Sequence, residues 1–151
     1  MNKVVKITAG MIGCLFLLFS VSSSAKEVKL DAAGEKAYNT IKTASYFGTG
    51  GIGRGGTISQ GELALRILVK QVNAESALES LLKVANPAGR MYVLVGLKQY
   101  YPAVFAEVVP QYQSVKTKLR SMRGCIADIK TVASIVAEIK KGQHDVLPKR
   151  K

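Results

Sequence analysis

The sequence predicts an all-α domain, a compact array of about five to six short helices with a glycine-rich loop between the first and second helix. Apolar residues recur at every third or fourth position along most of the chain, as they do on the buried face of an amphipathic helix. Residues that cap helices stand at the starts of these segments, and glycine or proline follows several of them. No convincing pair of alternating strands is present, which favours the helical interpretation.

The first two helices are expected on either side of the glycine-rich loop. Asp31 can cap a first helix that ends near Phe47. Residues 48–56 are rich in glycine and should form a loop. Ser59, with Glu62 three residues later, has the spacing of a capping box and predicts the start of the second helix.

Three further helices are expected in the middle of the chain. Asn73 is placed to cap the third helix, and Asn86 followed by Pro87 predicts a sharp boundary before the fourth. Residues 91–97 are apolar nearly all round, so we expect the fourth helix to be central. Pro102 can open a short fifth helix.

The pattern of residues 111–123 fits two kinds of structure. A helix places Tyr112, Val115, Leu119 and Met122 on one face, whereas a strand would alternate Val115, Thr117 and Leu119 with basic residues. We prefer the helix because the neighbouring pattern is helical. Asp128 is then expected to cap a last helix that ends at Gly142.

Two consecutive segments carry a resemblance to a known class. ESALESLL at 75–82 and NPAGRMYVLVGL at 86–97 together resemble one helical hairpin of the HEAT and armadillo repeat class. No second copy occurs at a fixed period. The resemblance implies HEAT-like hairpin packing and a scaffold that binds partners, and it brings no catalytic residues with it.

Residues 1–25 have the organisation of a secretory signal peptide. Lys3 and Lys6 precede an almost wholly apolar run at 7–21, and small residues up to Ala25 suit cleavage by a signal peptidase. Cys14 follows a glycine, as in a bacterial lipobox, but the strongest apolar segment lies after it, which disfavours a lipid anchor there. We expect an exported protein of the bacterial periplasm, with secretion as the second reading.

Removal of that signal leaves a single basic domain. The expected divisions are a helical domain at 26–142 and a basic flexible tail at 143–151. The formal charge falls from +12 to +10, because two basic residues and no acidic one leave with residues 1–25. Such an excess favours an envelope protein or an anionic envelope surface as partner, and export disfavours nucleic acid.

Four basic residues form the densest positive cluster and the first candidate site. They are Lys116, Lys118, Arg120 and Arg123. A helix would place three of them on one face, and a strand would do the same for Lys116, Lys118 and Arg120. We therefore expect a face that attracts an anionic partner, against the simpler interpretation of a solvated surface.

The glycine-rich loop is the second candidate, as an anion-binding site. Consecutive backbone N–H groups can converge on an anion, and the residues placed to do so are Gly53, Arg54, Gly55 and Ser59. The simpler interpretation is a plain connection between helices. The same loop matches a dinucleotide motif by letter, but no strand–loop–helix pattern surrounds it, so no nucleotide is expected.

The sequence offers no catalytic, metal or cofactor site. His144, the only histidine, is expected in the flexible tail, where it could not serve a catalytic triad. Cys125 is interpreted as a buried small residue, with a disulfide to a partner as the alternative. We therefore expect a non-enzymatic interaction protein of the envelope, such as an adaptor, inhibitor or immunity-like protein. A peripheral binder of anionic lipid or polymer and an unrecognised enzyme are the alternatives.

Overall fold

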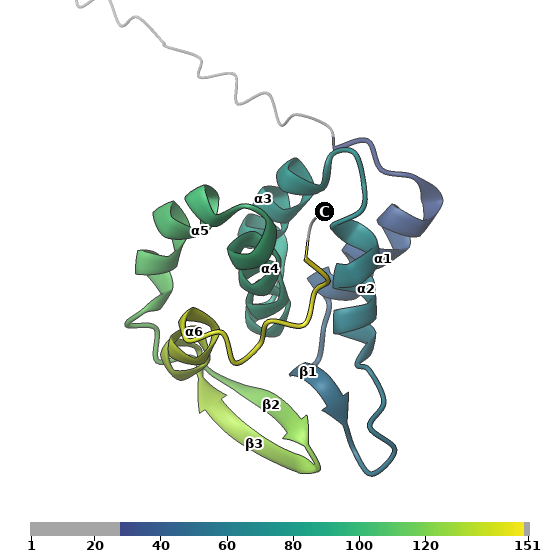
Figure 1. Cartoon of the computed structure of the whole chain (residues 1–151). Coiled ribbons are helices and arrows are strands. Elements are labelled where there is room, and N and C mark those ends of the chain that lie inside the picture. The colour runs from purple at the N-terminus through teal and green to yellow at the C-terminus, as the bar shows by residue number, and fades with distance from the viewer. Residues whose placement is uncertain (1–27, 150–151) are drawn as a thin grey trace, which may run out of the picture.

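A computed structural model describes residues 28–149, which form six α-helices, one 3-10 helix and a three-stranded sheet. Along the chain the elements are α1 (Ala32–Lys42), β1 (Phe47–Ile52), α2 (Gln60–Leu68), α3 (Ala74–Val84), α4 (Pro87–Tyr100), α5 (Pro102–Val108), η1 (Val109–Tyr112), β2 (Lys118–Gly124), β3 (Ile126–Thr131) and α6 (Val132–Lys140). In Figure 1 the sheet lies below the helices, and α6 lies beside the β2–β3 hairpin.

The sheet has the order β1-β2-β3 and mixes two kinds of pairing. β1 runs parallel to β2, with Phe47 opposite Ser121, and β2 runs antiparallel to β3, with Arg123 opposite Ile126. Gly124 begins the two-residue turn between β2 and β3, with a φ of 55° that suits glycine in a tight hairpin. The prediction of an all-α domain is therefore wrong.

The helix preferred for residues 111–123 is wrong over its second half, where the alternative strand is correct. In β2 the side chains alternate, with Leu119 and Ser121 buried and Lys118 and Arg120 exposed. Asp128 consequently lies in β3 and caps no helix. The last helix, α6, begins three residues later than expected from a cap at Asp128, at Val132, and Thr131 caps it by accepting a hydrogen bond from the Ser134 N–H at 3.2 Å.

The expected loop at residues 48–56 is a strand over its first part. Glycines give β1 almost no side-chain pattern, so nothing in the local sequence indicates a strand. Its partner β2 lies far away in the chain, and pairing at Phe47 and Gly48 supplies the backbone hydrogen bonds of the strand. The remainder is a tight turn closed by reciprocal hydrogen bonds between Ile52 and Thr57.

The predicted helix caps are largely confirmed. Asp31, Ser59 and Asn86 accept hydrogen bonds from backbone N–H groups three residues ahead, at 2.7, 3.1 and 2.8 Å. Asn73 precedes α3 without a side-chain cap, and its amide donates instead to the Lys29 carbonyl at 2.9 Å. Gly142 follows α6 with a φ of 80°, in the position where glycine commonly ends a helix.

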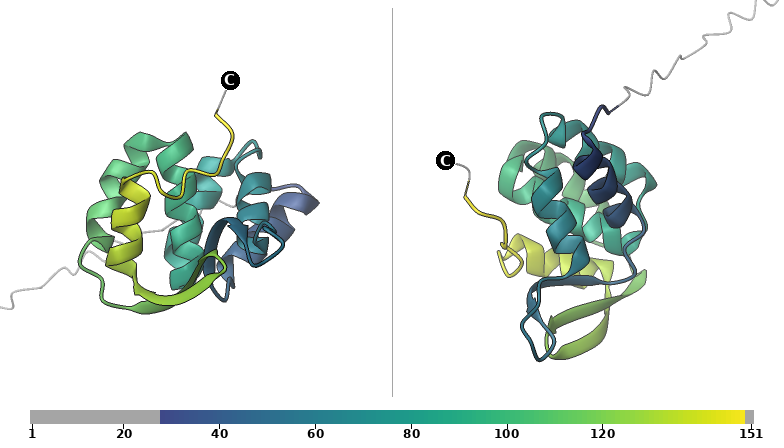
Figure 2. Two further views of the ribbon diagram at one scale, coloured as in Figure 1. Left: turned by 60° about the horizontal axis from the view of Figure 1, so that its bottom comes forward. Right: turned by 90° about the vertical axis from the view of Figure 1, so that its right-hand side faces the viewer.

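Helix α4 is the centre of the core, as predicted. Every residue from Met91 to Leu97 is buried, because α4 contacts helices on several sides and the sheet below them. α3 and α4 form the expected consecutive pair, but the HEAT-like array of helices is replaced by a helical layer packed on a sheet. Figure 2 shows this arrangement from two further directions.

The segment after α6 is not a flexible extension over its described part. His144 and Leu147 are buried, at 2% and 6% exposure, and the Lys98 ammonium holds Asp145 at 2.7 Å. Gln99 adds two hydrogen bonds to the backbone of Leu147, at 3.0 and 3.3 Å. Residues 143–149 therefore pack against α4, which corrects the expectation of a tail that stands apart.

Replacement of Gly89 by alanine should destabilise the fold. A Cβ atom at Gly89 would collide with the backbone carbonyl of Ile41, where α4 crosses α1. We expect Gly89→Ala to lower the free energy of unfolding by about 1–3 kcal/mol, the usual range for overpacking, as measured by urea denaturation. Gly55→Ala is the matched control, because its Cβ would meet only a Thr57 methyl group at 3.7 Å, and an equal loss in both variants would contradict this packing.

Candidate functional site

The backbone of β1 is enclosed by polar side chains from the helices. Gly48 donates its N–H to the Tyr92 hydroxyl at 2.8 Å, and its carbonyl accepts from Tyr92 at 3.0 Å and from Ser59 at 2.6 Å. Ser59 is 2% exposed and Tyr92 is 1% exposed. Burial raises the pKa of Tyr92, which keeps its hydroxyl neutral and able to donate.

Glu62 supplies a buried negative charge beside the same strand. Its carboxylate is fully buried, accepts the Gly50 N–H at 2.7 Å and pairs with Arg66 at 2.7 and 3.0 Å. Arg66 also donates to the carbonyl of Val146, which ties the C-terminal segment to α2. The Glu62 side chain thus bonds to the strand rather than only closing a local capping box.

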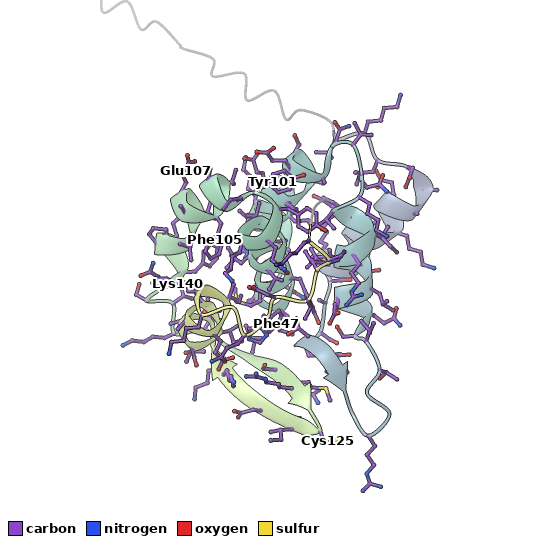
Figure 3. The ribbon with its side chains drawn as sticks, in the orientation of Figure 1. Phe47, Tyr101, Phe105, Glu107, Cys125 and Lys140 are labelled. Atoms are coloured by element: carbon purple, nitrogen blue, oxygen red, sulfur yellow. The ribbon has the colours of Figure 1, made fainter. Side chains whose placement is uncertain are left out.

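His144 links the C-terminal segment to β1 and α6. Its Nδ1 lies 2.6 Å from the Thr49 hydroxyl, and its Nε2 lies 3.1 Å from the Glu138 carboxylate. Lys130 donates to the other Glu138 oxygen at 2.6 Å. The Phe47 ring packs edge-on against His144, with centroids 4.9 Å apart, and Figure 3 shows Phe47 between the helices and the sheet.

The electrostatics of this chain of groups favour a neutral histidine. Burial lowers the pKa of His144 against the opposing effect of Glu138, and Arg123 and Lys130 lower it further by repulsion. Burial alone would raise the pKa of Glu138, but hydrogen bonds from Lys130 and His144 outweigh it and lower the pKa.

A hydroxyl, a histidine and a carboxylate in sequence have the chemistry of a nucleophile, a base and an orienting acid. The expectation that His144 could not be held rigidly is therefore wrong. Thr49 is only 7% exposed. Its contact with His144 joins β1 to the C-terminal segment, and the contact of His144 with Glu138 joins that segment to α6. No sequence signal marked this arrangement, because its members are far apart in the chain.

The predicted anion site in the glycine-rich loop is not assembled. Gly53 donates its N–H to the Gly124 carbonyl at 2.8 Å. The Ser59 hydroxyl is already hydrogen-bonded to the Gly48 carbonyl and the Tyr92 hydroxyl. Arg54 and Gly55 are exposed at the tip of the turn. The anionic group that accepts a hydrogen bond from the β1 backbone is the carboxylate of Glu62.

The predicted basic face is assembled in part. Lys118 and Arg120 are exposed on one face of β2, and Lys116 is exposed just before the strand. Arg123 points to the opposite face by strand alternation and donates to the Gln143 side chain at 3.1 Å. We call the side of the sheet that carries Lys118 and Arg120 the outer face.

The outer face also contains a hollow of about 410 Å³ next to Arg120. Ile52, Met122 and Ala127 contribute apolar atoms to its lining, and Ser45, Tyr46, Thr57 and Ser121 contribute to it as well. Tyr46 also lines a neighbouring hollow of about 320 Å³ that reaches the Tyr92 ring. Ile129 stands further along on β3 with 67% of its surface exposed.

Cys125 is exposed at the tip of the hairpin, as Figure 3 shows, so the expectation of a buried cysteine is wrong. Within the part of the chain that the structure describes, no group of three or more histidine, cysteine or acidic side chains could hold a metal ion. The described helices include none that is long and apolar enough to span a bilayer.

Loss of the charge on Glu62 should destabilise the protein. Glu62→Gln leaves Arg66 without its partner and weakens the acceptor for Gly50. Because the Arg66 side chain is 37% exposed and water can solvate it, we expect a loss of about 1–3 kcal/mol in chemical denaturation, less than for a fully buried pair. Glu79→Gln on the exposed side of α3 should change stability by less than about 0.5 kcal/mol, and a similar loss in both variants would contradict the role of Glu62.

Acid should destabilise the fold through His144. Its pKa lies below the ordinary 6.5, so below that pH the unfolded chain binds a proton that the folded chain resists. The stability that the neutral His144 contributes should therefore be fully present above pH 6.5. It should be lost as the pH falls from 6.5 through the lowered pKa of His144. Urea denaturation from about pH 8 to about pH 5 measures this slope. His144→Gln should flatten it, and an unchanged slope in that variant would show that other groups titrate.

No protein-family model matches the chain, and neither a curated protein nor a solved structure is significantly similar to it.

Proposed function

We propose that this chain is an exported, non-enzymatic interaction protein of the bacterial envelope that binds an acidic partner protein through the outer face of its sheet. The observation that carries the proposal is the hollow beside Arg120, which is lined by both apolar and polar residues and lies on the face that carries the exposed Lys118. The export signal that supports the compartment lies outside the described residues.

The charges of the outer face are available to a partner. Lys116, Lys118 and Arg120 are exposed, and none of the ion pairs found within residues 28–149 involves them. Unpaired positive charge attracts an acidic surface and orients its approach.

The hollow gives such a partner a place to bury an apolar side chain. Protein interfaces concentrate their binding energy in aromatic, arginine and apolar anchors near the centre of a contact. Tyr46, Met122 and Arg120 are of these types and line one hollow. An acidic segment with one apolar residue would place that residue in the hollow and its carboxylates beside the basic side chains.

A double substitution on the outer face should abolish partner binding. The double variant Arg120→Glu, Met122→Glu is immobilised on a support, and so is the unaltered chain. The proteins that each retains from the native envelope fraction are then compared. We expect at least about a tenfold loss of a partner that the unaltered chain keeps in about 0.5 M salt, because a packed interface outlasts screening of its charges. Circular dichroism checks that the variant is folded.

The matched control is Lys140→Glu with Lys141→Glu, which changes more charge at exposed positions near the end of α6. Retention of the partner by the control and its loss by the outer-face variant would support the proposal. Equal losses in both variants would contradict it. Binding only to anionic phospholipid vesicles, lost near physiological salt, would replace it with a peripheral membrane role.

A further inference from the structure

The inner side of the β2–β3 hairpin carries a second hollow, which shares only Ser121 with the lining of the outer hollow. Cross-strand partners point to the same side of a sheet, so the pairs Ser121–Asp128 and Arg123–Ile126 share the inner side. The hollow has a volume of about 490 Å³ and is lined by Ser121, Arg123, Gly124, Ile126, Asp128 and Lys130. This volume lies in the ordinary range for small-molecule sites.

Ser121 provides a polar group that the fold leaves without a partner. It is 4% exposed and lines the hollow, and its hydroxyl makes no hydrogen bond to any described residue. The hydroxyl oxygen is not among the fully buried unpaired atoms of the described residues, so it is open to the hollow. A ligand atom in the hollow would accept its hydrogen bond.

The charged side chains of the hollow have free hydrogen-bonding capacity. Arg123 donates to the neutral side chain of Gln143 at 3.1 Å and pairs with no carboxylate in residues 28–149. Asp128 accepts the Ile129 N–H through Oδ1 at 2.7 Å, and its Oδ2 accepts nothing from the described side chains. Lys130 uses one of its three donors on Glu138.

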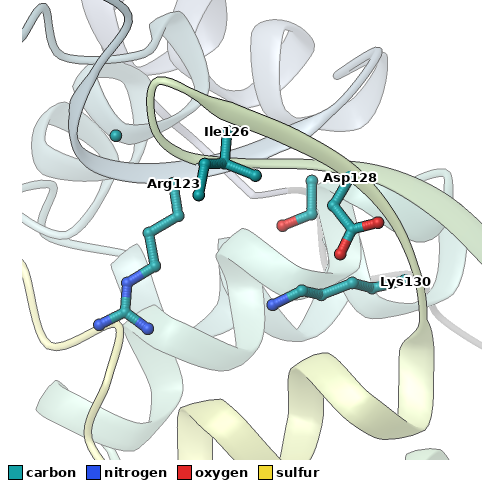
Figure 4. A pocket seen from close by; sticks show the side chains of 6 residues that line it. Arg123, Ile126, Asp128 and Lys130 are labelled. Carbon is teal, nitrogen blue, oxygen red and sulfur yellow. The ribbon is translucent and has the colours of Figure 1, made fainter.

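Arg123 lies on one side of the hollow, and Asp128 and Lys130 lie together on the other. Figure 4 shows the Arg123 guanidinium and the Lys130 ammonium extending into the same space, with the Asp128 carboxylate above Lys130 and Ile126 near Arg123. Glu138, which does not line the hollow, already pairs with Lys130, so the groups left for a ligand are the Arg123 guanidinium and the Asp128 carboxylate, which have opposite charges.

We propose that this inner hollow binds a small zwitterion, a free amino acid or a short peptide whose carboxylate and ammonium groups lie a few bonds apart. The ligand's carboxylate pairs with the guanidinium of Arg123 and accepts a hydrogen bond from the Ser121 hydroxyl. The ammonium group is held by Oδ2 of Asp128. An apolar side chain of the ligand packs on Ile126, which is otherwise 72% exposed. The proposal does not depend on the partner assigned to the outer face.

Titration with L-leucine and with L-alanyl-L-leucine tests the proposal and separates the two sources of this chemistry. Binding is followed by calorimetry and by the proton resonance of His144, the only histidine of the chain, which is linked to the hollow through Glu138 and Lys130. We expect saturable binding of at least one of the two ligands. L-leucinamide, without a carboxylate, and N-acetyl-L-leucine, without an ammonium group, should bind at least about tenfold more weakly.

Arg123→Gln and Ser121→Ala should each weaken binding, by at least about tenfold for Arg123→Gln. Arg120→Gln is the matched control, because it removes the same charge from the same strand on the other face, and it should bind as the unaltered chain does. The Ser121→Ala variant keeps the test decisive if Arg123→Gln is unstable. The proposal is overturned by an absence of saturable binding up to about 10 mM, by equal binding of the blocked ligands, or by binding that neither variant weakens.

Discussion

The backbone of β1 has to be hydrogen-bonded inside the helical layer, and this constraint organises the rest of the molecule. The strand contacts α2 and α4 and brings peptide groups into a dry core, where an unpaired group is costly. Tyr92 and Ser59 satisfy Gly48, and the Glu62 carboxylate satisfies Gly50. Helices and sheet are thereby joined through polar contacts as well as apolar packing.

The same constraint explains why the C-terminal segment is part of the domain. His144 pairs with Thr49 of β1 and Glu138 of α6, and Arg66 of α2 binds the Val146 carbonyl. These contacts close the end of the sheet against α4. A chain that ended at Gly142 would expose Phe47, whose ring packs against His144, and would leave the Thr49 hydroxyl without this partner.

The β2–β3 hairpin has two faces with different chemistry, since side chains alternate along each strand. The outer face combines unpaired lysine and arginine side chains with a hollow of mixed apolar and polar lining, a surface suited to a macromolecule. The inner face holds both signs of charge and an unpaired hydroxyl around a smaller set of side chains, which suits a small ligand. A single hairpin can therefore carry two independent sites.

The sequence by itself determined the helix starts at Asp31, Ser59 and Asn86 and the burial of α4, because caps and apolar periodicity act between residues close in the chain. Only the strand alternative for residues 111–123 placed Lys118 and Arg120 on one face, whereas the preferred helix grouped Arg120 with Lys116 and Arg123. Only the tertiary structure decided that residues 47–52 form a strand, that Asp128 lies in a hairpin and that His144 is buried. The strand at 47–52 and the burial of His144 depend on partners distant in sequence, and a glycine-rich strand has no side-chain pattern that indicates its pairing. The hairpin at Asp128 is local, but its strands alternate over too few residues to outweigh the helical pattern around them.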